Sequence, residues 1–486
     1  MLCLVRSLKS SLAPINRIPH EVLLLIPGCC DKNDMNQDLT TLTHICRGWR
    51  DVFTSCSSLW TRLDFMNVSK TRTYIQRSQS SPLEIRLKQG YLDDAFSLVT
   101  PHLRRLKSLT ICVDALPDVL RHFHRQAPLL EELNITSYHN RNPILDGALF
   151  DGDLSSLRKL SLSGAITTAH LPWNSMTNLK VFNFRSRSSG YNLTQLLDFF
   201  ESTPLLHTIE LVDSNQYSSD APPQRTVSLP HLNALTINAY RPRFILLDHL
   251  CIPTGASLIL RLILRGEDSP LVDYFPEPSL NLRNLSHITM INLLFNSGEN
   301  FVRLSGPSGS LHVLAHLMCR ETDPYATNRR IFHSLGIPIL SATQRLAVSM
   351  FRHPNPAEAK NSPVFRTLSS TNGLRTLILT KCDNLPFILA LDPEENPLKL
   401  VLCPDLGKLV LYVKSQDQSY IEHLISMAKN RASRGAKLSS ITIASLGELV
   451  SGWNVIELRK HITDVKYRVG EAPPAWDYIP GESGDR

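Results

Sequence analysis

A six-residue pattern, L-x-x-L-x-L with other apolar residues allowed at the leucine positions, recurs along most of this 486-residue chain. The first positions of its ten occurrences are Leu106, Leu130, Leu157, Leu179, Leu206, Leu232, Leu285, Leu374, Leu406 and Leu438. The first six lie 22 to 27 residues apart, and the last three lie 32 residues apart. A repeat of this length constrains the fold strongly, because a single unit cannot bury its own apolar face and must stack on its neighbours.

Each repeat predicts one strand and, in several cases, one helix. The last three positions of a match, such as Leu160-Ser161-Leu162, alternate apolar and polar residues as a half-buried strand requires. Between the matches, residues 118–126, 192–202 and 420–430 have apolar residues at helical spacing. We therefore expect an α/β fold in which parallel strands stack into a solenoid over 66–465.

This pattern resembles the leucine-rich-repeat superfamily, although the repeats are degenerate. Of the repeats compared at the superfamily's Asn or Cys position beyond the strand, Cys382 alone conforms. The other residues there are Asp114, Tyr138, Ala165, Arg187, Ser214 and Tyr240. The region 295–370 leaves the register, and it predicts two strands around the loop Ser305–Ser310. We interpret this region as irregular repeats with a surface insertion within one repeat region, and a domain boundary there is the alternative.

The N-terminal segment has a different, helical pattern. Pro19 stands where a first helical turn tolerates proline, ahead of an apolar run that starts at Val22. Asp38 is a candidate cap for a second helix, which the apolar spacing from Leu39 to Phe53 predicts as one continuous amphipathic element. About fifty residues with two or three helices make a poor free-standing core, so the segment needs a partner or the neighbouring domain.

This segment resembles the F-box family, including F-box proteins of fungi. The patterns I-P-x-E-V-L-x-x-I, D-L-x-x-L-x-x-I-C-R-x-W-R and S-L-W-x-x-L-D follow one another from Ile18 to Asp64. The resemblance implies a substrate receptor of a cullin–RING (SCF-type) ubiquitin ligase, in which the F-box binds a Skp-type adaptor and thereby a cullin. The adaptor-binding candidates that it implies are Ile18, Pro19, Val22, Leu23, Ile26, Leu39, Leu42, Cys46, Trp49, Leu59 and Trp60.

The predicted organisation is a tail at 1–14, an F-box at 15–65, the repeat region at 66–465 and a tail at 466–486. Some of the F-box candidates must also hold the helices together, and Trp49 and Trp60 can each be a partner anchor or part of the core. Two other functional classes stay open: a repeat scaffold whose F-box does not engage a ligase, and a catalytic domain hidden within 66–465.

The sequence gives no support for an enzyme. It lacks the motifs G-x-S-x-G, H-E-x-x-H, G-x-x-x-x-G-K-[ST] and G-x-G-x-x-G. The nearest approach to a metal site is His312, His316 and Cys319, whose spacing suits one helical face but which has no fourth ligand nearby. We predict no catalytic residue, no metal and no cofactor.

The charge and apolar patterns limit the partners. The net charge of +7 is small for this length, so we expect no nucleic-acid partner. No apolar run approaches the length of a membrane span, and the ten scattered cysteines suit a reducing compartment, so we expect the cytoplasm and/or the nucleus. We hypothesise that arginines after repeat strands bind an acidic or phosphorylated segment of an unknown protein substrate. They are Arg185, Arg187, Arg241, Arg243 and Arg265.

Overall fold

The computed structural model describes the parts of the chain from which the fold can be traced. They are residues 18–29, 35–64, 67–88, 92–113, 122–137, 149–164, 173–186, 193–213, 225–239, 245–262, 288–295, 300–306, 312–317, 341–349, 363–380, 382–413, 418–445 and 452–469. The contacts divide the chain into two compact units, Met1–Pro222 (unit 1) and Pro223–Arg486 (unit 2). The division falls inside the predicted repeat region, and whether 66–465 unfolds as one unit stays a prediction.

Unit 1 begins with short helices and continues with strands. Its α-helices are α2 (His20–Leu23), α3 (Met35–Thr43), α4 (Arg47–Ser55), α5 (Val68–Arg77), α6 (Leu92–Val99) and α8 (Leu193–Ser202). Its 3-10 helices are η2 (Ile26–Cys29), η3 (Ser57–Trp60), η4 (Thr100–Arg105), η5 (Leu149–Gly152) and η6 (Trp173–Ser175). Its strands are β1 (Arg62–Asp64), β2 (Leu83–Lys88), β3 (Leu106–Val113), β4 (Glu132–Ser137), β5 (Lys159–Gly164), β6 (Val181–Ser186) and β7 (Thr208–Asp213).

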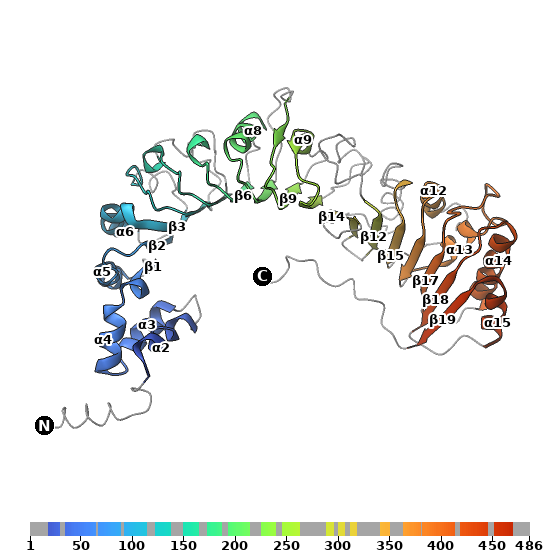
Figure 1. The fold of residues 1–486 in the computed structure, drawn as a ribbon, viewed down its shortest axis with the longest axis horizontal. Helices are drawn as coiled ribbons and strands as arrows, with labels where there is room; N and C mark the ends of the chain where they lie inside the picture. Colours follow the sequence, from blue (N-terminus) through green and yellow to red (C-terminus); the bar gives the residue numbers. More distant parts are fainter. Residues whose placement is uncertain are drawn as a thin grey trace. The chain divides into compact units, whose positions relative to one another are not determined.

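The strands of unit 1 are parallel, and each pairs with the next one along the chain (Figure 1). The leucine template sets their register, since Leu109 pairs with Leu133, Leu133 with Leu160, and Leu160 with Phe182. These four side chains are buried, while the strand residue that follows each of them is half-buried. These residues are Thr110, Asn134, Ser161 and Asn183. The predicted parallel α/β arrangement is therefore present in this unit.

Aromatic rings pack between successive strands of unit 1. The ring of Phe123 lies 5.8 Å from that of Phe96 and 5.7 Å from that of Phe150, and all three side chains are buried. Residues 122–126 form turns and irregular backbone, so the helix predicted over 118–126 is wrong in this part. Its first residues lie outside the described residues. The helix predicted over 192–202 is confirmed as α8.

Unit 2 contains further strands and helices. Its strands are β8 (Val227–Ser228), β9 (Ala234–Ala239), β10 (Leu250–Cys251), β11 (Ser257–Leu262), β12 (Met290–Phe295), β13 (Asn300–Ser305), β14 (His312–Leu317), β15 (Arg345–Ser349), β16 (Thr376–Thr380), β17 (Lys408–Val413), β18 (Ser440–Ser445) and β19 (Asp464–Val469). Its helices are α9 (Ile245–Asp248), α12 (Pro363–Ser369), α13 (Leu385–Leu391), α14 (Gln418–Ser433) and α15 (Gly452–His461).

One sheet of unit 2 has the strand order β14-β13-β12-β15-β16-β17-β18-β19. The strands β12, β13 and β14 are antiparallel neighbours, which confirms the two strands predicted on either side of Ser305–Ser310. From β12 through β15 to β19 the pairing is parallel. In a separate pairing, β9 is parallel to β11.

Two strands of this sheet were not predicted, and one was misplaced. The template match at Leu285 put a strand end at Met290, but β12 begins there, and Ile291 pairs with Leu346 of β15. The strand β15 was missed because its first template position is Thr343, a polar residue that is fully buried here. The strand β19 was also missed. It pairs in register with β18, with Val465 opposite Ile441.

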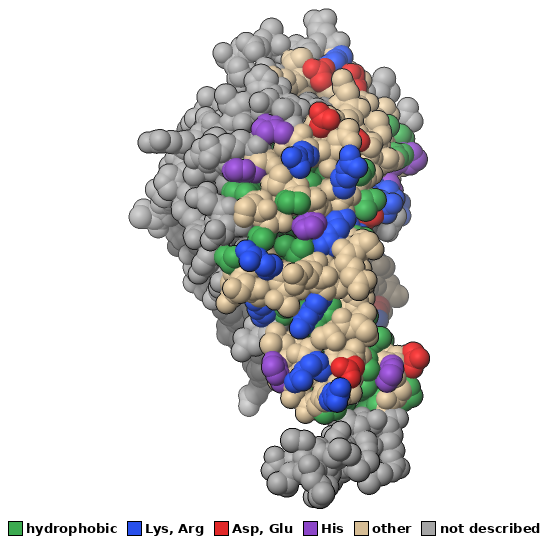
Figure 2. All heavy atoms as spheres, turned by 90° about the vertical axis from the view of Figure 1, so that its left-hand side faces the viewer, with side chains coloured by type: hydrophobic (Ala, Val, Ile, Leu, Met, Phe, Trp, Pro, Cys, Tyr) green, Lys and Arg blue, Asp and Glu red, His purple; other side chains and the backbone are tan. Residues whose placement is uncertain are grey.

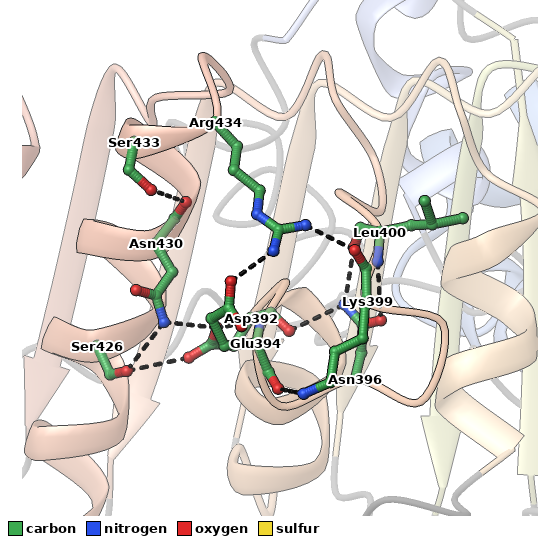
Figure 3. Close-up of polar contacts among 9 residues, drawn as sticks. All are labelled: Asp392, Glu394, Asn396, Lys399, Leu400, Ser426, Asn430, Ser433 and Arg434. Carbon is green, nitrogen blue, oxygen red and sulfur yellow. Dashed lines mark hydrogen bonds and ion pairs between the residues drawn. The ribbon is translucent and has the colours of Figure 1, made fainter.

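Polar side chains of α14 hold the loop that follows α13 in unit 2 (Figure 3). The buried carboxylate of Asp392 accepts hydrogen bonds from Ser426 Oγ at 3.1 Å and Asn430 Nδ2 at 2.9 Å. Arg434 pairs with Glu394 and donates to the carbonyl of Lys399. The loop therefore has a fixed path in spite of having no regular secondary structure.

The position of Cys382 fits the role that its repeat position implies. Its thiol donates a hydrogen bond to the carbonyl oxygen of Val348 in the neighbouring strand, with a distance of 3.1 Å between sulfur and oxygen. Among the repeats compared, this is the one in which the superfamily's Asn or Cys position holds one of these two residues. In the described part of the chain, no helix is both long and apolar enough to cross a membrane.

Candidate functional site

The first helix of the N-terminal segment starts at an exposed proline. The backbone N–H groups of Val22 and Leu23 both donate to the carbonyl of Pro19 at 3.1 Å, which satisfies two groups that a helix start otherwise leaves open. Pro19 has φ −54° and lies at the N-cap position, one residue before the first turn. The helix α2 buries Leu23 and exposes Val22 on its other side.

The predicted helix from Leu39 to Phe53 is wrong, because it consists of two helices. The first, α3, includes Asp38 in its body, so Asp38 is not its cap. The chain turns at His44 and Ile45, and α4 starts after Cys46, whose Sγ accepts a bond from the N–H of Trp49 at 3.5 Å. The helices α3 and α4 pack against each other, and α3 also packs against η2.

Trp60 is part of the core. Its indole Nε1 donates to the carbonyl of Phe53 at 2.8 Å, and its side chain is only 1 % exposed. The ring of Tyr74 lies edge-on at 4.8 Å between centroids, and the guanidinium of Arg77 lies 4.4 Å from the centre of the Trp60 ring. Trp60 therefore links η3 to helix α5, which carries Tyr74 and Arg77.

Tyr74 extends this connection to α3. Its hydroxyl lies 3.2 Å from Thr40 Oγ1, and burial raises the pKa of this phenol above its ordinary value. Because Tyr74 and Arg77 lie on α5, beyond the predicted F-box boundary at 65, the N-terminal helices and the start of the strand region share one core. The sequence signal for this shared core was the spacing of Tyr74, Ile75 and Arg77, which is that of an amphipathic helix just beyond the predicted F-box.

The other candidates divide by exposure. Leu23, Leu39, Trp49 and Trp60 are buried; Ile18, Ile26, Leu42, Cys46 and Leu59 are partly buried; and Pro19 and Val22 are exposed. The buried members hold the segment together in this structure. A role in adaptor binding stays a prediction for the whole set.

Three large apolar side chains of this segment face solvent. They are Val22, Leu25 and Ile45, exposed by 48 %, 67 % and 50 %. Leu25 and Ile45 were not among the sequence candidates, although both occupy positions inside the quoted patterns. Exposed apolar groups on a small helical module are typical of a surface that a partner covers.

The structure tests little of the hypothesised arginine set. Arg185 is exposed at the end of β6. The other four members, Arg187, Arg241, Arg243 and Arg265, lie outside the described residues.

Among the described residues, no group of His, Cys, Asp or Glu side chains has the arrangement of a metal site. Cys319 of the predicted trio is not described, and His312 and His316 lie in strand β14 rather than in a helix.

The helical segment that carries the exposed apolar residues has a recognisable family. Residues 15–66 match the F-box-like family. A search among curated proteins found no match to the chain. The match covers the three short helices α2, α3 and α4, the turn η3 and strand β1. It ends just before α5, which supplies Tyr74 and Arg77 to the same core.

Proposed function

We propose that this chain is the substrate-recognition subunit of a cullin–RING (SCF-type) ubiquitin ligase. The F-box-like match at 15–66 supports the proposal most directly. In this proposal the F-box binds a Skp-type adaptor, and through it a cullin. The exposed apolar side chains Val22, Leu25 and Ile45 supply a surface for the adaptor, because burying the exposed part of each one contributes about 1 kcal/mol to a complex.

The remaining strands then act as the substrate receptor. Parallel strands that pair in chain order present their alternate side chains in rows, and such rows suit the capture of another protein. Leucine-rich repeats are the proposed identity of these strands, with a solenoid as the proposed architecture. The chain carries no catalytic role in this proposal, and it works in the cytoplasm and/or the nucleus.

The packing of Trp60 against Tyr74 bears on how the receptor works. A rigid connection between the adaptor-binding and substrate-binding parts fixes the position of a captured substrate. The connection here consists of buried aromatic contacts and the hydrogen bond from Trp60 to Phe53, and it contains no exposed linker between η3 and β1. The proposal therefore treats the F-box and the first strands of unit 1 as one rigid part.

Immunoprecipitation of the full chain from cells tests the proposal. Mass spectrometry of the captured proteins should find a Skp-type adaptor and a cullin in comparable amounts. The double variant Val22→Asp and Leu25→Asp should lose both, while Leu398→Asp, a change at an exposed leucine of unit 2, should keep both. Capture of other proteins without adaptor or cullin would instead support a scaffold that does not engage a ligase.

A further inference from the structure

The outward face of the sheet in unit 1 carries a row of uncharged polar side chains. Thr110 of β3 lies opposite Asn134 of β4. Asn134 lies opposite Ser161 of β5, which in turn lies opposite Asn183 of β6. Each of the four follows a buried template residue in its strand, so its side chain points away from the core and is half-buried. We call these four residues the polar row.

The residues beside the polar row are mostly uncharged or carry opposite charges. Two residues further along each strand, the outward positions from β3 to β6 are Cys112, Thr136, Ser163 and Arg185. Two residues earlier, Glu132 lies opposite Lys159. The row itself is bounded by Arg86 of β2 and Glu210 of β7. On the face in Figure 2, too, Lys and Arg side chains are scattered among uncharged surface. The polar row therefore offers no cluster of cations to an acidic or phosphorylated segment.

Two hydrogen bonds orient the amides of the polar row in the same way. Asn134 Nδ2 donates to Thr110 Oγ1 at 3.4 Å, and Asn183 Nδ2 donates to Ser161 Oγ at 3.3 Å. In both cases the hydroxyl comes from the preceding strand, so the same pair of groups occurs twice. Within the described part of the chain, the Oδ1 and the second N–H of each asparagine have no partner. Each amide therefore offers one acceptor and one donor to a ligand.

The spacing of the two amides selects the conformation of a ligand. Neighbouring strands lie about 4.8 Å apart, so Asn134 and Asn183, two strands apart, are separated by about 9.6 Å. A polyproline II helix repeats every three residues with a rise of about 3.1 Å per residue, which gives about 9.3 Å per turn. A β-strand repeats every two residues, at about 6.7 Å, and does not match. The polyproline II backbone makes no internal hydrogen bonds, so its N–H and C=O groups are available to both amides.

We infer that the polar row binds a neutral, proline-rich segment of a substrate protein in the polyproline II conformation. The inference rests on the proposed role of the strands in substrate recognition. Asn134 and Asn183 each bond one N–H and one C=O of the segment, one turn apart. The segment needs a residue other than proline once per turn, because proline has no backbone N–H. A flexible segment fits less well, since ordering it costs more conformational entropy.

Fluorescence anisotropy with the full chain tests this inference. The probe is a fluorescein-labelled peptide of repeated alanine-proline-proline, which presents one N–H per turn. Polyproline of the same length keeps the conformation but lacks the N–H groups, and a glycine-serine peptide has the N–H groups but is flexible. The probe should bind at least about tenfold more tightly than either control. Raising the salt from about 50 to about 300 mM should leave its affinity unchanged, since the polar row carries no charge.

Substitutions in the polar row locate the site. The double variant Asn134→Ala and Asn183→Ala should bind the alanine-proline-proline peptide about tenfold more weakly, because both amides are removed. Thr110→Val with Ser161→Ala removes only the hydroxyls that orient the amides, and should weaken binding by a smaller factor. Asn233→Ala, at an exposed asparagine just before β9 in unit 2, should leave the affinity unchanged. A melting temperature close to that of the wild type shows that each variant is folded.

Three results would overturn the inference. They are binding of the alanine-proline-proline peptide no tighter than that of polyproline, equal binding by the folded double asparagine variant, and a steep loss of affinity with added salt. None of these measurements includes the adaptor, so they leave the proposed ligase function untouched. Peptide binding by a chain that binds no adaptor would support the polar row and contradict only the proposed ligase function.

Discussion

Two tryptophans that the sequence treats alike differ in their hydrogen bonds. The indole N–H of Trp60 donates to the carbonyl of Phe53, one of the last carbonyls of α4, which has no acceptor role inside the helix. The indole N–H of Trp49 is also buried but has no acceptor in the described part of the chain. The Trp49 ring instead contacts Phe53 edge-on, with 5.8 Å between centroids.

This difference predicts unequal costs for the same substitution. Trp60→Phe leaves the carbonyl of Phe53 without its donor, whereas Trp49→Phe removes a donor that has no acceptor. Because an unsatisfied buried group costs about 1–3 kcal/mol, Trp60→Phe should lower the free energy of unfolding by about 1–2 kcal/mol more than Trp49→Phe. Urea denaturation of the two variants measures the difference, and equal midpoints would contradict this account.

Cys403 shows how burial sets the chemistry of a single thiol. Burial raises the pKa of Cys403 from 9.0 to about 11, and its Sγ donates to the carbonyl of Leu368 at 3.3 Å. The neutral thiol is the form that the folded state favours. Cys29 and Cys251, by contrast, are exposed.

The raised pKa of Cys403 predicts a loss of stability in alkali. The stabilisation is fully present below pH 9, where the thiol is neutral in both states, and it is lost as the pH rises toward 11. The loss should reach about 1–3 kcal/mol. Between pH 9 and 11, the free energy of unfolding should fall less steeply with rising pH in Cys403→Ala than in the wild type. Rapid alkylation of Cys403 in the folded protein at neutral pH would contradict the assignment.

At the scale of elements, periodicity predicted the strands better than the helices. The template placed β3 to β7 in the correct register, because alternate burial fixes which residues face the core. It failed at β12, since Ile288, Met290, Ile291 and Leu293 satisfy the same template at two registers. Apolar spacing also predicted one helix across the turn at His44. A break of a few residues leaves the apolar residues of α4 at nearly the spacing that a continuous helix would give.

Two arginines at the C-terminal end of α14, one inside the helix and one just beyond it, have different roles. Arg431 is buried and donates to the carbonyls of Leu402 at 2.7 Å and Cys403 at 2.8 Å, and burial lowers its pKa. Arg434 lies at the surface, where it pairs with Glu394 (Figure 3). One arginine therefore satisfies buried backbone groups, and the other adds an exposed ion pair.

Arg431→Met should destabilise unit 2 by about 3–5 kcal/mol, because at least two buried carbonyls lose their donor. Arg434→Met, at the surface in the turn just after the same helix, should cost less than about 1 kcal/mol. Thermal unfolding of the two variants provides the comparison. Similar melting temperatures for both would show that Arg431 does not support the loop.

At the scale of the whole molecule, the sequence identified the kind of module better than its surface. The three F-box patterns run from Ile18 to Asp64 and lie inside the family match at 15–66. They did not separate surface from core, because apolar residues serve both purposes. Trp60 and Leu39 are buried, while Leu25 and Ile45 are exposed. A test based on Trp60→Ala would therefore unfold the module before it tested any partner.

The direct affinity of a purified Skp-type adaptor for the full chain tests the central claim. Titration calorimetry should give a dissociation constant below about 1 μM for the wild type. The variant with Val22→Asp and Leu25→Asp should bind about 100-fold more weakly, because charged groups replace exposed apolar contacts without disturbing the core. Leu398→Asp should bind as the wild type does. No measurable affinity of the wild type, or equal affinity of the folded double variant, would contradict the account.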